Sequence, residues 1–187
     1  MEENKKSSED IISAHVIFAM TAGAIPVPVA DIVAVSAIQY DLIRQLAAFY
    51  NVNYDADKGK TLASSLAGAT LSRIGASALK AIPGVGTILG IGSQIVMAGA
   101  TTYALGKLFD SHFSRGKGLD NINLDSVKEQ YNELVKKGKE YAKDLKKSFS
   151  KEDVFQTIEK LNQLKESGAI TEEEFQRTKE KLLNKIV

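Results

Sequence analysis

Cysteine is absent from the 187 residues, and histidine occurs only twice, at His15 and His112. The lack of cysteine excludes disulfides, thiolate catalysis and every cysteine-ligated metal site. Neither histidine has a second type of metal ligand near it in sequence, so each is expected to be a hydrogen-bonded buried or interfacial side chain. No Ser-His-Asp set is readable either. The sequence therefore predicts a protein that is not an enzyme and has no catalytic, cofactor-binding or metal-binding residues.

An excess of charge of one sign is also missing. The chain carries 24 Lys and Arg against 23 Asp and Glu, so its net charge of +1 gives no bias toward nucleic acid. The first ten residues hold two Lys and four acids, which is the wrong sign for a secretory signal. We therefore expect a cytoplasmic N-terminus and no nucleic-acid partner. The apolar fraction of 44% is enough for a hydrophobic core.

Proline is scarce, and all three prolines stand in a phrase that occurs twice. Ala24–Asp31 reads AIPVPVAD, and Ala81–Thr87 echoes it as AIPGVGT. Because the residue before a proline is pushed away from helical angles, each copy is expected to separate two helices. The helices are expected over residues 10–24, 29–49, 57–80 and 87–112. The sequence thus predicts an all-α protein whose duplicated hairpins, residues 10–113, form a four-helix core after a tail of residues 1–9.

Polar residues within these apolar helices are the candidate binding or structural positions. Asp31 and Gln39 are eight residues apart and so lie close to one helix face. Two interpretations stay open: Asp31 caps its helix and Gln39 bridges two helices, or the pair binds a ligand or ion. Tyr50 and Tyr103, at corresponding hairpin ends, are expected to pack in a core or interface with their hydroxyls toward water. The full set is Pro26, Pro28, Asp31, Gln39, Tyr50, Pro83, Gly84, Gly86, Tyr103 and Gly106.

Residues 81–106 carry no charge and are rich in glycine. A glycine inside a helix costs about 1 kcal/mol relative to alanine, so this many indicate close backbone approach to a neighbour. A membrane span needs about 20 apolar residues. Residues 11–25 are too few to cross, and Gly84–Gly106 is long enough but only weakly apolar. Two interpretations therefore stay open: the two hairpins insert shallowly into one leaflet of a membrane, or they pack on each other as a soluble four-helix core.

The chain changes character after Ser114–Gly118, and residues 114–150 read as a linker followed by a Lys-rich amphipathic helix. Its apolar residues alternate by three and four from Leu124 to Leu145, in a stripe that Gly138 interrupts. Eight Lys against four acids lie between Lys128 and Lys151. Such a helix can lie on an anionic membrane, pair with another helix, or present a solvated charged face.

Residues 151–187 predict a small helical hairpin. Gly168 ends the first helix, and Thr171 with Glu174 forms a capping box for the second. A unit this small rarely buries enough surface to be stable alone, so we expect it to dock or self-associate. The side chains expected to mediate oligomerisation are Leu161, Leu164, Ile170, Phe175 and Leu182.

The first part of the chain resembles the bacterial family called domain of unknown function 697. The matching residues are Ala24–Pro28, Ala30–Asp31, Ile38–Gln39, Leu46–Ala48, Tyr50–Val52, Ile82–Gly86 and Thr101–Gly106. The family's usual Gly-Ala-Asp after the second proline is Val29-Ala30-Asp31 here. This family often sits beside or inside GTPase chains, and some members are membrane proteins. The resemblance implies a GTPase as protein partner, and no enzymatic activity.

The C-terminus resembles the short C-terminal domain known as SHOCT. The match runs from Leu161–Lys165 through Gly168–Phe175 to Lys181–Leu183. The resemblance implies oligomerisation or tethering.

A phosphate-binding loop is not expected in the chain itself. Gly59-Lys60-Thr61 resembles the end of such a loop, but Tyr54 occupies the position where the loop needs its first glycine.

Two functions from different classes remain open at this point. One is a non-enzymatic scaffold on the cytoplasmic side of a membrane, working with a GTPase and oligomerised through its C-terminal hairpin. The other is a soluble helical adaptor that binds a protein partner in an apolar groove.

Overall fold

The computed structural model describes residues 7–24, 30–78, 86–148 and 150–184, and it describes side chains over 7–24, 33–68, 94–148 and 150–184. Within these residues the chain forms seven α-helices, one short 3-10 turn and no strand. The helices are α1 (Ser8–Ala22), α2 (Ala30–Phe49), α3 (Ala56–Ala78), α4 (Gly86–Phe113), α5 (Leu124–Lys146), α6 (Lys151–Glu166) and α7 (Glu172–Leu183), with the 3-10 turn at Leu119–Asn121. The all-α fold predicted from the sequence is confirmed.

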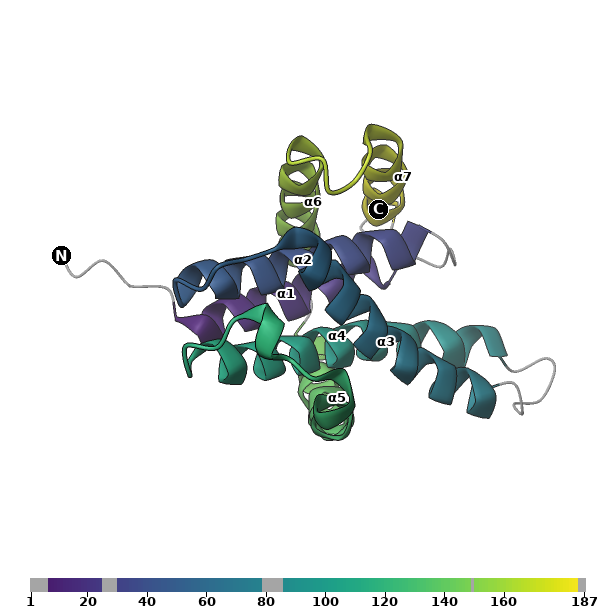
Figure 1. Cartoon of the computed structure of the whole chain (residues 1–187). Helices are drawn as coiled ribbons and strands as arrows, with labels where there is room; N and C mark the ends of the chain where they lie inside the picture. Colours follow the sequence, from purple (N-terminus) through teal and green to yellow (C-terminus); the bar gives the residue numbers. More distant parts are fainter. Residues whose placement is uncertain (1–6, 25–29, 79–85, 149, 185–187) are drawn as a thin grey trace.

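Helices α1 and α2 pack together in the middle of the molecule (Figure 1). Helix α4 lies against both of them, and α5 packs on α4. Helices α6 and α7 stand on the opposite face of the α1–α2 pair, where α6 meets α1 and α7 meets α2. The molecule is therefore layered, with α1 and α2 between the C-terminal hairpin and the α4–α5 layer.

Local capping signals fix where α1 and α7 begin. The Ser7 side chain accepts a hydrogen bond from the Asp10 backbone N–H, and the Asp10 carboxylate accepts one from the Ser7 N–H. Because Ser7 is the cap, α1 begins at Ser8, two residues before the expected start. The predicted capping box of Thr171 and Glu174 is confirmed at the start of α7.

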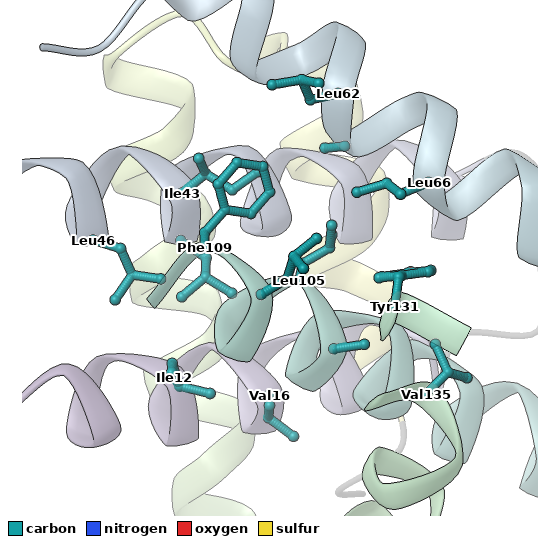
Figure 2. Packing of buried hydrophobic residues seen from close by; sticks show 14 of the residues in the cluster. Ile12, Val16, Ile43, Leu46, Leu62, Leu66, Leu105, Phe109, Tyr131 and Val135 are labelled. Carbon is teal, nitrogen blue, oxygen red and sulfur yellow. The ribbon is translucent and has the colours of Figure 1, made fainter. Parts of the chain in front are cut away.

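The main hydrophobic core is built from α1 to α5, as Figure 2 shows. Ile12 and Val16 of α1 face Leu105 and Phe109 of α4, and all four are at most 1% exposed. Tyr131, from α5, is buried in the same cluster. The Lys-rich helix thus uses its apolar stripe to complete the core of the N-terminal domain.

Gly138 lies within the apolar stripe of α5, and α5 runs through it as one long helix, as the sequence predicts. A Cβ built on Gly138 would lie 2.7 Å from the backbone oxygen of Ala100, so the missing side chain lets α5 approach the α4 backbone. Gly106 likewise lies against Ile12, whose side-chain carbons would be 2.9 Å from an added Cβ. These glycines act at helix crossings.

Candidate functional site

The most distinctive polar feature is a buried carboxylate, Asp41, in the middle of α2. Its side chain is 2% exposed. One carboxylate oxygen accepts hydrogen bonds from His15 Nε2 at 3.0 Å and Gln45 Nε2 at 2.7 Å, and pairs with the ammonium of Lys160. The other oxygen accepts two hydrogen bonds from Arg44. Every acceptor side of this carboxylate is therefore used.

Burial alone would raise the pKa of Asp41, because desolvation penalises the charged form. The hydrogen bonds from His15, Lys160 and Arg44 outweigh that effect and hold the pKa well below its usual range. Asp41 is consequently a fixed negative charge. Lys160 is 8% exposed, and it supplies the cation from the C-terminal hairpin.

His15 lies at the same site and is 1% exposed, as expected of a buried, hydrogen-bonded histidine. Its Nδ1 is 2.7 Å from the backbone oxygen of Ile11, and its Nε2 faces Asp41. Both ring nitrogens thus face oxygen acceptors. His15 ties α1 to α2 at the same carboxylate oxygen of Asp41 that Lys160 reaches from α6.

The same helices that form this ion pair also form an apolar interface. We call the hairpin-facing side of α1 and α2 the seat, and its buried members are Ala19, Ala22, Ala34, Ala37 and Ile38. The hairpin packs Leu161, Leu164, Ile170, Phe175 and Leu182 on it, and these five side chains are 0–5% exposed. The five residues expected to mediate oligomerisation are thus covered within one chain. The small alanines of the seat let the hairpin approach closely, and Lys160 with Asp41 fixes its position.

Sequence reasoning missed both Asp41 and Lys160. Thr157, Lys160, Leu161 and Leu164 recur at helical spacing, so Lys160 falls in the buried stripe of its helix. A charged residue at such a position needs a buried partner. That signal was readable, but it does not say which carboxylate the lysine meets.

The other candidates from the sequence are distributed over the core. Gln39 is 4% exposed and donates hydrogen bonds to the hydroxyls of Thr101 and Thr102, both at 3.1 Å, which links α2 to α4. The Tyr50 hydroxyl was expected to face water, but it donates to the Asp110 carboxylate at 2.7 Å. Tyr103 packs against Tyr141 with ring centroids 5.0 Å apart.

Several candidate positions fall outside the described residues. These are Pro26, Pro28, Pro83, Gly84 and the side chain of Asp31. The backbones of Asp31 and Gly86 are described and lie in the first turns of α2 and α4. His112, the second histidine, is half-buried, and its Nε2 lies 3.0 Å from the Gly118 carbonyl oxygen.

One side of α5 carries a row of lysines, of which Lys139 is half-buried and the others are exposed. Lys136, Lys139, Lys143 and Lys146 follow one another by three, four and three residues, so they share one face, which we call the lysine face. Lys136 and Lys143 pair with acids three residues earlier on the same helix. Exposed pairs of this kind contribute only about 0–1 kcal/mol. Lys139 and Lys146 make no ion pair with any residue that the structure describes. The lysine face is therefore available to an anionic partner.

No helix in the described part of the chain is both long and apolar enough to cross a membrane. Among the same residues, no cluster of three or more His, Asp or Glu could hold a metal ion. The fold and its surfaces define an all-helical protein whose C-terminal helical hairpin docks on its own N-terminal domain.

The chain belongs to the family described as Domain of unknown function (DUF697), whose model matches residues 1–140. The Short C-terminal domain (SHOCT) matches residues 156–183. Both resemblances inferred from the sequence are thereby confirmed. The chain is 36% identical over 144 residues to Magnetosome membrane protein 22 of Magnetospirillum gryphiswaldense, a match that covers 74% of each protein. No solved structure matches the chain.

Proposed function

We propose that this protein is a non-enzymatic scaffold that associates with the cytoplasmic side of an anionic membrane and self-associates through its C-terminal hairpin. The observation that carries the proposal is the relative named a magnetosome membrane protein, which matches 74% of this chain. The lysine face of α5 supplies a physical means of attachment.

Electrostatic attraction supplies most of the binding free energy in this attachment. The apolar side of α5, including Tyr131, Val135 and Ala142, is buried in the core and so is not available to enter lipid. Each Lys or Arg near an anionic leaflet contributes about 1 kcal/mol, and salt screens this attraction over a Debye length of about 8 Å at physiological ionic strength. Binding by the lysine face is therefore expected to be peripheral and sensitive to salt.

Sedimentation with vesicles tests the membrane part. The whole chain is mixed with vesicles of neutral phosphatidylcholine, or with vesicles containing anionic phosphatidylglycerol, over a series of salt concentrations. The triple variant Lys139→Gln, Lys143→Gln, Lys146→Gln is expected to lose roughly 100-fold in affinity for anionic vesicles, from about 1 kcal/mol per lysine.

A control variant separates this surface from net charge. Lys60→Gln, Lys117→Gln and Lys137→Gln remove the same charge from exposed positions outside the lysine face and are expected to bind nearly as wild type. Equal losses in the two variants would reject the lysine face as the contact. A wild-type protein that stays in the supernatant with both vesicle types would overturn membrane association and favour the soluble adaptor.

The adaptor alternative has a defined surface to test. A groove of about 230 Å³ lies between α1 and α6 and is lined by Asp10, Ser13, Ala14, Ile17, Phe18 and Gln156. Phe155, beside Gln156 on α6, is 49% exposed. A protein partner of this groove would lose affinity when Phe18 is changed to Ser, with vesicle binding unaffected.

A GTPase is the protein partner that we propose, on the ground of the family resemblance. The test is co-purification of the tagged chain from its native cells, followed by measurement of GTP hydrolysis in the recovered material. Recovery without GTP hydrolysis above that of the untagged control would count against this partner.

A further inference from the structure

The C-terminal hairpin is joined to its own chain by a short connection and meets a seat far away in sequence. Four residues separate the end of α5 at Lys146 from the start of α6 at Lys151. The hairpin's buried side chains share one cluster with residues of α1 and α2, and this cluster is separate from the main core of α1 to α5. The hairpin therefore docks through an interface that the seat of another copy of the chain could supply equally well.

The interface contains one buried ion pair, and the folded chain is less stable when that pair is not formed. The ammonium of Lys160 reaches Asp41, and both side chains are at most 10% exposed. Breaking a buried pair by removing one partner is strongly destabilising, because the remaining charge stays desolvated. When the hairpin leaves its seat, Lys160 loses Asp41, Asp41 keeps only its partners on α1 and α2, and the apolar surfaces of both sides lose their contacts.

A self-associated form has two ways to use the hairpin. A contact between two undocked hairpins would expose both seats and leave each Asp41 without its lysine. A hairpin placed on the seat of another copy would restore every contact of the closed chain, including the pair of Lys160 with Asp41. The second arrangement costs only association entropy and a rearranged connection, and exchange of an identical element between two copies is a low-cost route to a dimer.

We propose that two copies of this chain exchange their C-terminal hairpins, so that Lys160 of each copy pairs with Asp41 of the other. The inference rests on the self-association in the proposed function and names its surface and its partner, which is a second copy of the chain. The exchanged dimer also carries two lysine faces, so it would bind an anionic membrane with higher avidity than one chain does.

A mixing experiment with the full chain tests the exchange. Asp41→Asn removes the negative charge of the seat and leaves the hairpin unchanged. Lys160→Met removes the positive charge of the hairpin and leaves the seat unchanged. Neither variant can form the native pair within one chain or within its own dimer. An exchanged heterodimer contains one native pair, together with one seat where both partners are neutral. Native mass spectrometry of an equimolar mixture is expected to show the heterodimer enriched about tenfold or more over the statistical ratio.

The matched control uses the exposed ion pair of Glu140 with Lys143. A mixture of Glu140→Gln and Lys143→Met is expected to give the statistical ratio, because an exposed pair contributes little. A wild-type dimer combined with a statistical ratio for the Asp41 and Lys160 variants would overturn the exchange but leave self-association intact. A wild-type chain that stays monomeric at all concentrations would overturn both, while vesicle sedimentation still tests the membrane part separately.

A second measurement covers the case in which a variant fails to fold. The chain has no cysteine, so single cysteines can be introduced without background. Ala37→Cys on the seat and Leu164→Cys on the hairpin belong to one apolar cluster. Mixed chains that each carry one of these cysteines are expected to form a covalent dimer with a short bismaleimide. Absence of this product, when one chain with both cysteines cross-links internally, would overturn the exchange.

Discussion

Replacement of Asp41 by Asn is the sharpest test of how the hairpin is held. The change keeps the shape of the side chain and removes its charge, while the ammonium of Lys160 stays buried against it. Removing one partner of a buried pair costs about 3–5 kcal/mol. That is a large share of the roughly 5–15 kcal/mol that stabilises a typical domain.

Lys160→Met is expected to cost less than Asp41→Asn. The Asp41 carboxylate keeps its hydrogen bonds from His15, Arg44 and Gln45 when the lysine is gone. A hydrogen bond to a charged group contributes about 1.5–3 kcal/mol, which sets the scale of the loss. The double variant removes both charges, so its cost is expected to fall below the sum of the two single costs, by a coupling of about 0.5–3 kcal/mol.

Urea unfolding of the four proteins at neutral pH measures this cycle. Limited proteolysis reports release of the hairpin, because the connection between α5 and α6 is cut when α6 leaves its seat. A loss below about 1 kcal/mol for Asp41→Asn, or additive single costs, would refute the view that this pair holds the hairpin.

Three further predictions concern pH, a helix crossing and a cap. Because the pKa of Asp41 is lowered by folding, its stabilisation is present above its ordinary value of 3.8 and is lost as pH falls below it. The difference in melting temperature between wild type and Asp41→Asn should therefore shrink from pH 6 to pH 3; a constant difference would contradict this. Gly138→Ala should cost about 1–3 kcal/mol by pressing on the Ala100 carbonyl. Its control Gly68→Ala, where nothing lies within 4 Å, should be neutral or stabilising in the same urea assay. Asp31→Asn should change the unfolding free energy by no more than about 1 kcal/mol if Asp31 only caps α2, because Asn also caps well.

The sequence alone determined the features that depend on neighbours within about one helical turn. Helix type follows from apolar spacing, and the start of α7 follows from the capping box at Thr171, whereas α1 begins two residues before its expected start. The C-terminal hairpin and both family memberships were readable for the same reason, since they rest on contiguous motifs.

Tertiary structure decided which helix faces meet. The sequence singled out Asp31 and Gln39 by their apolar neighbours, yet the charged centre of the molecule is Asp41, which pairs with Lys160 from a distant helix. Tertiary structure also decided that the apolar stripe of α5 is buried in the core, so the lysines of α5 lie outside the core. Helical spacing gives each helix its buried side but carries no information about the partner. That choice depends on close packing at positions such as Gly138 and on the desolvation of one carboxylate, and both exist only once the helices have come together.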